Sequence, residues 1–409
     1  MTRAAPDSTM PEVRGTVSPG FEPLRDLMSE ALEAEAGCAL SIWLDGRPAC
    51  DLWAGEAQPG RPWQRDTLCL AFSVGKGLTT LCVQLLAGRG ELDIEAPVTR
   101  YWPEFAQAGK EAVTVRMLLG HTVGLPTFPR YWDAIGPDGR GLEDWELMTA
   151  RLAAAPPAWT PGTHYQYHAI TFGYLVGEVV RRISGMSLGR FFATEVAEPL
   201  SLQTWIGTPP EVHHRLAPLQ PAPPLPDTPA TRAWQQVVDA SREAVAAGDA
   251  YAPAALAFAS PILLHPAVTD LQTHVPELFN RPWIHEAEIP ASNPITDARS
   301  LAQMYGHLAV GGFAEITPRL VEEFTVPEPQ AVAAGLPQPT LVGYHLVLSE
   351  RRPAQAPGRP FGHAGAGGSL GFADPALRLG FGYVKNRMLD GVWTKRFVDA
   401  AYDCAASAT

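Results

Sequence analysis

The chain has 409 residues, of which 46% are hydrophobic and 18% charged. This balance is typical of one or two globular units with a sizeable core and excludes a disordered chain. The formal net charge is −12, from 31 basic and 43 acidic residues, which argues against a nucleic-acid partner because a phosphate backbone needs clustered Lys and Arg.

Composition also argues against a metal, a cofactor and a membrane. The five cysteines are odd in number and form no C-x-x-C motif, so we expect free thiols, a reducing compartment and a cytoplasmic location. His213 and His214 are adjacent rather than four residues apart, and H-E-x-x-H is absent, which predicts surface histidines rather than zinc ligands. Residues 1–20 have no apolar leader, and no apolar run approaches the ~18 residues of a membrane span.

Hydrophobic periodicity predicts the elements in chain order. Residues 1–20 are expected to form a flexible tail, and 39–44 and 49–53 to form a hairpin around Asp45-Gly46. Apolar residues at helical spacing predict helices at 21–36, 73–86, 113–119, 170–183, the end of 291–312, and 392–402.

Short apolar runs at 341–348, 368–372 and 377–384 predict further strands near the C-terminus. An antiparallel sheet joining these strands to the early hairpin, flanked by helices, gives an α+β fold. The predicted sheet domain comprises 21–90 and 290–405. The predicted helical domain, 91–289, carries a variable insertion at about 201–289, and the proline-rich segment 217–230 within it is expected to be a surface loop.

The sharpest local motif is Ser73-x-x-Lys76, which follows an apolar run at the predicted start of a helix. Residues i and i+3 share a helix face, so the lysine amine can reach the serine hydroxyl. A serine becomes nucleophilic when a base removes its proton, and a lysine can be that base if its pKa is lowered by burial or a cationic neighbour. The alternative is an N-capping serine followed by a solvated lysine. Gly75 and Gly77 favour the first interpretation because they allow tight packing of this turn.

A second serine lies in Gly367-Gly368-Ser369-Leu370-Gly371, which matches the G-x-S-x-G nucleophile elbow. That fold requires the chain order Ser, Asp, His, but the last histidine is His363. We therefore reject Ser369 as the nucleophile.

Two further segments carry candidate groups. Tyr167 precedes the helix predicted at 170–183, and a phenol can act as a base where a cation such as Lys76 holds its phenolate; the alternative is a core aromatic, which we favour for Tyr165. Residues 362–368 contain many glycines, which let a backbone approach a ligand closely and complete an oxyanion hole. The alternative there is a bulged edge strand.

These three segments, in this order, resemble the serine β-lactamase and penicillin-binding-protein superfamily. The resemblance is strongest to class C β-lactamases, family VIII carboxylesterases and β-lactamase-like acyltransferases. It extends to the segments 92–103 and 113–126, to 161–163 before Tyr167, and to 365–375, and it covers about 21–200 and 290–400.

The resemblance implies a role for each matching residue. Ser73 would be acylated, Lys76 would be its base partner and Tyr167 would shuttle protons to the leaving group and from the incoming water or alcohol. The N–H groups of Ser73 and Ala366 would form the oxyanion hole. Contacts to the substrate are expected from His363, Gly365, His168, Trp132 and Trp159.

Two departures from class C enzymes bear on the substrate. Ala169 stands where those enzymes have an asparagine, and His363 replaces the lysine of Lys-Thr-Gly. A histidine is largely neutral at pH 7, so both changes weaken recognition of a β-lactam and leave the acylation residues intact. Aromatic residues near the expected cleft could line an acyl pocket, with a core role as the alternative; they are Phe128, Tyr131, Trp132 and Trp159.

The predicted function is therefore a serine acyl hydrolase, a carboxylesterase, or an acyltransferase acting through acyl-Ser73. The expected partner is a small-molecule ester, thioester or related acyl donor, with an alcohol or amine as an alternative acceptor to water. A β-lactamase or D-peptidase, and a non-catalytic binding protein on the same scaffold, remain as alternatives. The sequence does not indicate an oligomeric state.

Overall fold

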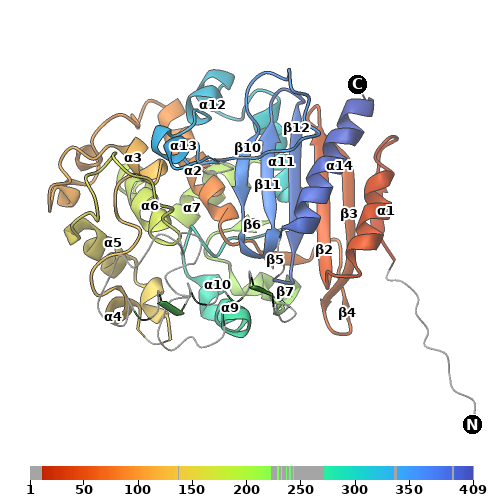
Figure 1. Ribbon diagram of the computed structural model, residues 1–409, viewed down its shortest axis with the longest axis horizontal. Helices are drawn as coiled ribbons and strands as arrows, with labels where there is room; N and C mark the ends of the chain where they lie inside the picture. Colours follow the sequence, from red (N-terminus) through yellow and green to blue (C-terminus); the bar gives the residue numbers. More distant parts are fainter. Residues whose placement is uncertain are drawn as a thin grey trace, which may run out of the picture.

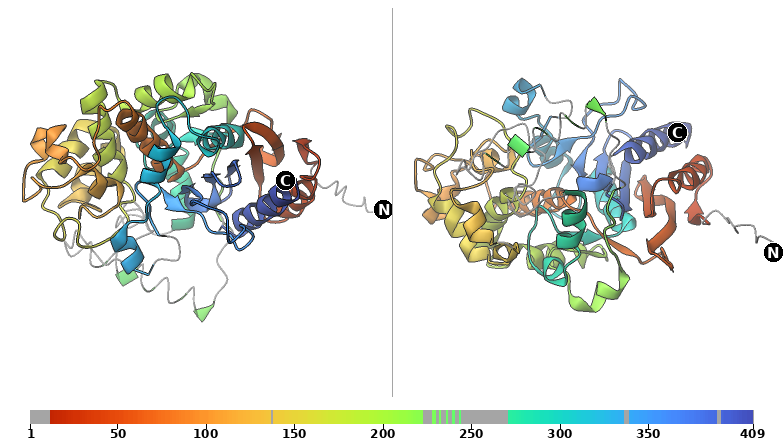
Figure 2. Two further views of the ribbon diagram at one scale, coloured as in Figure 1. Left: turned by 90° about the horizontal axis from the view of Figure 1, so that it is seen from above. Right: turned by 60° about the horizontal axis from the view of Figure 1, so that its bottom comes forward.

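A computed structural model describes residues 12–136, 138–222, 271–335, 339–388 and 391–408, with isolated positions between 228 and 243. A helical part, with α3 to α6, lies at one end of the molecule and a large sheet at the other (Figures 1 and 2). The proline-rich segment 217–230 lies partly outside the described residues.

The large sheet joins the two ends of the chain, as predicted. Its eight strands include the path β1-β3-β2-β12-β11-β10-β9, with β4 paired to β3. The central pairing is antiparallel and runs from Leu379 opposite Leu44 to Lys385 opposite Cys38. The strands are β1 (Arg14–Val17), β2 (Gly37–Leu44), β3 (Arg47–Gln58), β4 (Arg61–Pro62), β9 (His345–Leu346), β10 (Phe361–Ala364), β11 (Leu370–Asp374) and β12 (Leu379–Lys385).

Helices cover both faces of this sheet. On one face α1 (Pro23–Ala31) and α14 (Val392–Ala408) pack over an apolar core that includes Phe381 and Tyr383 of β12. On the other face α11 (Ala298–Ala309) lies directly against the strands. A Cβ at Gly380 would stand 2.2 Å from the Gly306 nitrogen. The alternation of glycine and large residues in β12 therefore gives one face for close helix approach and one for side-chain packing.

The helical part packs around α2 (Val74–Gly88), whose residues Val74 to Leu86 are all buried. Its neighbour α6 (Thr171–Ser184) ends at Gly185, which has a left-handed φ of 70°. The remaining helices are α3 (Val115–Leu119), α4 (Tyr131–Ile135), α5 (Trp145–Ala154), α7 (Leu188–Phe192), α9 (Leu271–Phe279), α10 (Pro282–Glu286), α12 (Pro318–Phe324) and α13 (Pro329–Ala333).

A small second sheet connects the two parts. Its order is β6-β8-β5-β7, and β5 pairs with β7 in parallel. The strands are β5 (Leu68–Leu70), β6 (Thr204–Trp205), β7 (Leu216–Ala217) and β8 (Ile295–Thr296). One apolar core extends from β5 and α2 through α6 to α11. The domain boundaries predicted at 90/91 and 289/290 stay a prediction.

Two predicted segments differ from the structure. Residues 14–17, expected within a flexible tail, form the edge strand β1, and Arg25 donates hydrogen bonds to the carbonyls of Val13 and Gly15. The side chains of this edge strand alternate between exposed and half-buried. Its sequence therefore lacks the apolar alternation that would predict a strand. The run 341–348 forms a strand only at its centre, where β9 pairs with β10.

Candidate active site

Ser73 lies at the junction between β5 and α2. The preceding residue, Phe72, has a left-handed φ of 49°, which is uncommon for a bulky side chain. Ser73 is the N-cap residue of α2, but its side chain makes no capping hydrogen bond, and it is partly exposed. Its hydroxyl is therefore available for chemistry, which contradicts the alternative of a capping serine.

Lys76 is fully buried and its amine has three hydrogen-bond neighbours. Nζ lies 3.1 Å from Ser73 Oγ, 2.7 Å from the Ala169 carbonyl and 3.1 Å from the Ala291 carbonyl. Burial lowers the pKa of Lys76 well below its ordinary value. A neutral amine has two N–H groups and one lone pair. With the lysine charged, Nζ donates to Ser73 Oγ as well as to both carbonyls. In the neutral form the two carbonyls, which can only accept, take both N–H groups, and the lone pair faces the serine hydroxyl.

Tyr167 lies beside the same pair. Its hydroxyl is hydrogen-bonded to Ser73, and Lys76 Nζ stands 4.6 Å from the centre of its ring. Burial raises the pKa of the Tyr167 phenol, and the contact with Ser73 lowers it to a smaller extent. The resting site therefore combines a neutral phenol with a lysine whose charge is disfavoured. This differs from the predicted phenolate held by a cation, because desolvation acts on both groups.

The strand β10 brings the glycine-rich segment against the nucleophile. A Cβ at Gly365 would stand 2.0 Å from the Ala71 carbonyl, so only glycine permits this approach. Ala366 follows directly, and Ser73 opens a helix whose first N–H groups lack intrahelical partners. Their two N–H groups remain our proposal for the oxyanion hole. Two residues before Gly365, His363 is 2% exposed, and its ring centre lies 6.1 Å from that of Tyr167.

Two histidines that the sequence analysis did not single out also contact Tyr167. His121 and His345 place their ring centres 4.9 Å and 5.6 Å from the Tyr167 ring. His121 has a left-handed φ of 59° and accepts a hydrogen bond from the His168 N–H at Nδ1. The position of His121 in the turn after 113–119 was the available signal. The sequence around His345 contained no such signal, because His345 reaches the site only through the pairing of β9 with β10.

Three of the expected substrate contacts are the side chains of His168, Trp159 and Trp132. Both ring nitrogens of His168 are engaged by backbone, with Nδ1 2.6 Å from the Gln166 carbonyl and Nε2 2.9 Å from the Leu125 nitrogen, so the fully buried ring has no nitrogen for a substrate. Trp159 is partly buried and donates from Nε1 to the Thr122 carbonyl. Trp132 belongs to α4, and its side chain lies outside the described residues. The prediction for His168 is therefore withdrawn.

Ser369, the rejected serine, is 2% exposed, and its carbonyl accepts the Gly365 N–H at 2.7 Å. It directly precedes β11 rather than a helix. This position lacks both the access and the strand-turn-helix setting of a nucleophile elbow.

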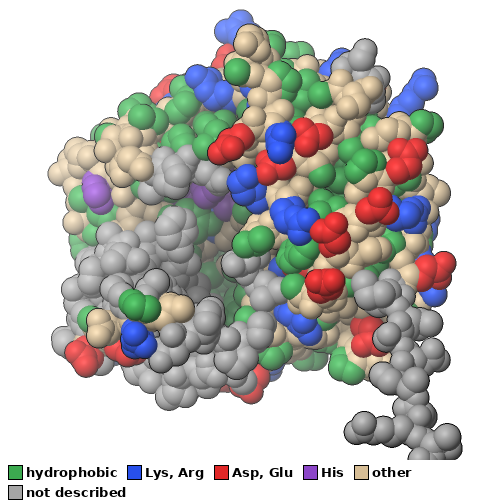
Figure 3. Space-filling view, turned by 45° about the vertical axis from the view of Figure 1, so that its right-hand side comes forward, with side chains coloured by type: hydrophobic (Ala, Val, Ile, Leu, Met, Phe, Trp, Pro, Cys, Tyr) green, Lys and Arg blue, Asp and Glu red, His purple; other side chains and the backbone are tan. Residues whose placement is uncertain are grey.

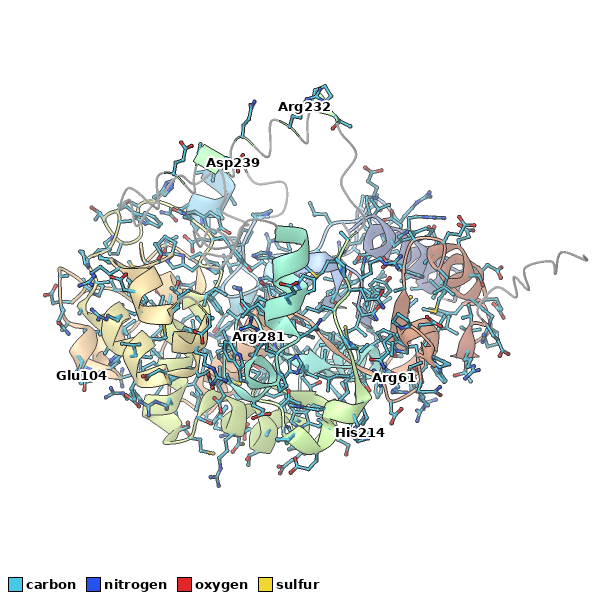
Figure 4. All side chains as sticks on the ribbon, turned by 90° about the horizontal axis from the view of Figure 1, so that it is seen from below. Arg61, Glu104, His214, Arg232, Asp239 and Arg281 are labelled. Carbon is cyan, nitrogen blue, oxygen red and sulfur yellow. The ribbon has the colours of Figure 1, made fainter. Side chains whose placement is uncertain are left out.

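His213 and His214 line a cavity of about 390 Å³ together with residues of β5 and β7. Arg61 donates to the His214 carbonyl there, and Figure 4 shows these two residues close together, far from Glu104.

Within the described ranges, no three His, Cys, Asp or Glu side chains are grouped to hold a metal ion. The same part of the chain contains no helix with the length and apolar content of a membrane span. On the face in Figure 3, acidic and basic side chains are interspersed.

A partly exposed serine, a buried lysine, a phenol and a glycine-rich segment form the arrangement expected of a serine acyl-transfer site on an α+β scaffold. The family model described as Beta-lactamase matches residues 24–399. The chain belongs to the beta-lactamase family, which confirms the predicted family and fold.

Individual relatives cover most of the chain. Esterase/beta-lactamase LipL from Mycobacterium tuberculosis (strain ATCC 25618 / H37Rv) is 34% identical in an alignment over 366 residues that covers 86% of this chain and 77% of the relative. A crystal structure of a family VIII carboxylesterase is 32% identical with a TM-score of 0.76, covering 96% of this chain and all of the other. EstA from Arthrobacter nitroguajacolicus Rue61a is 27% identical with a TM-score of 0.74, covering 96% of this chain and 99% of its own.

Proposed function

We propose that the protein is a serine carboxylesterase that works through an acyl-Ser73 intermediate. The observation that carries this proposal is the geometry of Lys76, whose two carbonyl partners direct its lone pair at Ser73 Oγ, 3.1 Å away. The names of the similar proteins, which include an esterase and a family VIII carboxylesterase, support the same activity.

In acylation, Lys76 takes the Ser73 proton while Oγ forms a bond to the ester carbonyl carbon. The N–H groups of Ser73 and Ala366 would hold the negative oxygen of the tetrahedral intermediate. When the carbon–oxygen bond to the alcohol breaks, Tyr167 delivers a proton to the leaving oxygen and regains one from Lys76. Water then attacks the acyl group by the same steps in reverse and releases the acid.

An alcohol or amine that replaces water would accept the acyl group, which is the acyltransferase alternative. The difference lies in which nucleophile reaches the acyl-enzyme first, and a small-molecule acyl donor is required in either case. A thioester would acylate Ser73 by the same steps, with the carbon–sulfur bond breaking and a thiol as the leaving group.

The β-lactamase alternative retains one observation in its favour, since the name of LipL includes that activity. Against it, the position of the cationic third-motif lysine is occupied by His363, whose pKa is lowered well below its usual range by burial and by the nearby His345 and Lys76. A neutral ring offers no charge to a β-lactam carboxylate.

We also propose a cytoplasmic location. The five cysteine thiols are all free and buried, which suits a reducing compartment.

The test is a panel of p-nitrophenyl esters, thioesters and the β-lactam nitrocefin, assayed with wild type and Ser73→Ala. We expect ester turnover, a covalent adduct of wild type with a fluorophosphonate by intact mass, and neither with Ser73→Ala. Faster turnover of nitrocefin than of every ester would favour the β-lactamase. Absence of any adduct on wild type would favour the non-catalytic binding protein.

A further inference from the structure

His121 lies in a tight turn directly after α3. Its φ of 59° is left-handed, a conformation that residues with a side chain seldom adopt and that is concentrated at functional sites. Two backbone hydrogen bonds fix the turn against α3, from the His121 N–H to the Leu118 carbonyl and from the Thr122 N–H to the Met117 carbonyl. The side chain is 1% exposed. The strained backbone therefore directs a polar ring into the interior, where its contacts need an explanation.

Those contacts hold the chain on both sides of Tyr167. The His121 carbonyl accepts the Gln166 N–H at 3.3 Å, and the side-chain Nδ1 of His121 accepts the His168 N–H at 3.0 Å. The ring centre of His121 also lies 4.9 Å from that of Tyr167. Two hydrogen bonds to one residue thus bracket Tyr167, and we call this pair of bonds the His121 clamp.

The clamp requires a neutral imidazole. Nδ1 of His121 can accept the His168 N–H only when it carries no proton, so the single proton of the neutral ring is on Nε2. Burial lowers the pKa of His121 well below its usual range, and the nearby His168 and Lys76 lower it further. The surroundings therefore keep the acceptor that the clamp uses.

His168 restrains the same segment from within. Its Nε2 accepts the Leu125 N–H at 2.9 Å, so its Nδ1 carries the proton and donates to the Gln166 carbonyl at 2.6 Å. Residues 166 to 168 are therefore tied to one another and to the turn that carries His121. The direction of the Tyr167 side chain depends on these ties.

That direction matters because the Tyr167 hydroxyl is bonded to Ser73. A general acid must lie within hydrogen-bond reach of the oxygen that it protonates. A displacement of about 1 Å at such a group can cost about 10²-fold in rate.

We propose that His121 is a positioning residue that aims the Tyr167 hydroxyl at Ser73 and at the leaving oxygen. This inference rests on the proposed acyl-Ser73 chemistry and goes beyond it, because it makes the hydrolysis of esters of weakly acidic alcohols depend on the clamp. An alkoxide must receive a proton as the carbon–oxygen bond breaks, whereas p-nitrophenolate leaves without one. An enzyme with a misplaced Tyr167 should therefore lose activity on alkyl esters first.

The experiment compares kcat/KM for ethyl butyrate and p-nitrophenyl butyrate, which share an acyl group and differ in the leaving group. His121→Phe keeps a ring beside Tyr167 but lacks the acceptor. His121→Gly removes the side chain and suits the left-handed backbone, so it tests the clamp even if phenylalanine disturbs folding. In both variants the ethyl-to-p-nitrophenyl ratio should fall by about tenfold or more.

The conservative variant is His121→Asn. Its Oδ1 is attached to Cγ as Nδ1 is in histidine, and asparagine tolerates a left-handed φ. This variant should therefore retain most of the wild-type ratio, although it lacks the ring.

Two controls separate positioning from general damage. His164→Phe changes an exposed histidine three residues before Tyr167 and should leave the ratio unchanged. In a Tyr167→Phe background, which has no phenolic proton to deliver, His121→Phe should lower the ratio no further.

Three kinetic outcomes would overturn the assignment: wild-type ratios in both His121→Phe and His121→Gly, equal losses on both esters, which indicate a structural role alone, or a further loss in the Tyr167→Phe background. The wild type provides a test that does not depend on the folding of any variant. In protein labelled with ¹⁵N-histidine, NMR should show His121 protonated at Nε2, and a proton on Nδ1 would exclude the clamp. All these outcomes leave the acyl-Ser73 proposal standing, whereas absence of any fluorophosphonate adduct on Ser73 overturns the proposed function and this inference with it.

Discussion

The amine of Lys76 stands 3.1 Å from the hydroxyl oxygen of Ser73, in a position where it is fully buried. The carbonyls of Ala169 and Ala291 occupy its other hydrogen-bonding directions. These carbonyls come from segments 93 and 215 residues further along the chain. Burial lowers the pKa of Lys76, so the arrangement favours an amine that can accept one proton from Ser73.

Removing the lysine base should nearly abolish turnover. Lys76→Met preserves side-chain length without an amine, and kcat should fall by about 10²–10⁴ in a p-nitrophenyl ester assay. Lys76→Arg should be equally poor, because a guanidinium keeps its proton and has no lone pair for Ser73. Lys395→Met, at an exposed ion pair with Asp399, is the matched control and should retain wild-type activity. An active arginine variant would remove Lys76 as the base.

The pH profile of kcat/KM should have a rising acid limb and a plateau. The base works only when neutral, so activity increases with pH as Lys76 loses its proton. Because burial lowers the pKa of Lys76 well below its ordinary 10.5, the plateau should begin well below that pH. Burial raises the pKa of Tyr167, so its phenol should keep its proton to pH 10 and cause no alkaline loss there. Stopped-flow assays across pH would contradict this if activity climbed only near 10.5.

Tyr167→Phe should separate chemistry from packing. The ring contacts with Lys76 and His121 remain, so the melting temperature should change little. The hydroxyl bonded to Ser73 is lost, so kcat should fall by about 10²–10⁴. Tyr165→Phe, which loses a hydroxyl bonded to Thr340 Oγ1, serves as the control. Wild-type kcat in Tyr167→Phe, measured beside a thermal melt, would exclude the phenol from proton transfer.

Gly365→Ala should damage the proposed oxyanion hole. The added Cβ would meet the Ala71 carbonyl at 2.0 Å, which forces β10 away from the nucleophile. Displacing one N–H donor should cost about 10²–10³ in kcat. Gly391→Ala is the control, because no heavy atom lies within 4 Å of its Cβ. If both variants matched wild type in ester turnover, the close approach of β10 would have no catalytic role.

Local patterns accounted for much of the fold. The hairpin at Asp45-Gly46, the helix after Ser73 and the C-terminal strands were predictable because alternation and helical spacing are properties of short segments. The edge strand β1 and the small sheet of β5 to β8 were not, since two- to four-residue strands carry too little pattern and depend on distant partners.

The candidate site also contains residues that local sequence predicted and residues that it did not. Ser73 and Lys76 were predictable because a spacing of three residues places both on one helix face. The false expectation for His168 and the omission of His345 have a common cause, since the partners of a ring nitrogen come from elsewhere in the chain. Nothing in the local sequence shows that Leu125, 43 residues earlier, engages one ring, or that β9 brings the other beside His363.

By itself, the sequence determined the order of the elements and placed the proposed nucleophile and its neighbouring amine on one helix face, because helix and strand periodicity are local. Only the tertiary structure decided that the amine is buried, that two distant carbonyls accept hydrogen bonds from it, and that burial lowers the pKa of the third-motif histidine. Protonation depends on desolvation and on the full set of hydrogen-bond partners, and both arise when remote segments pack together.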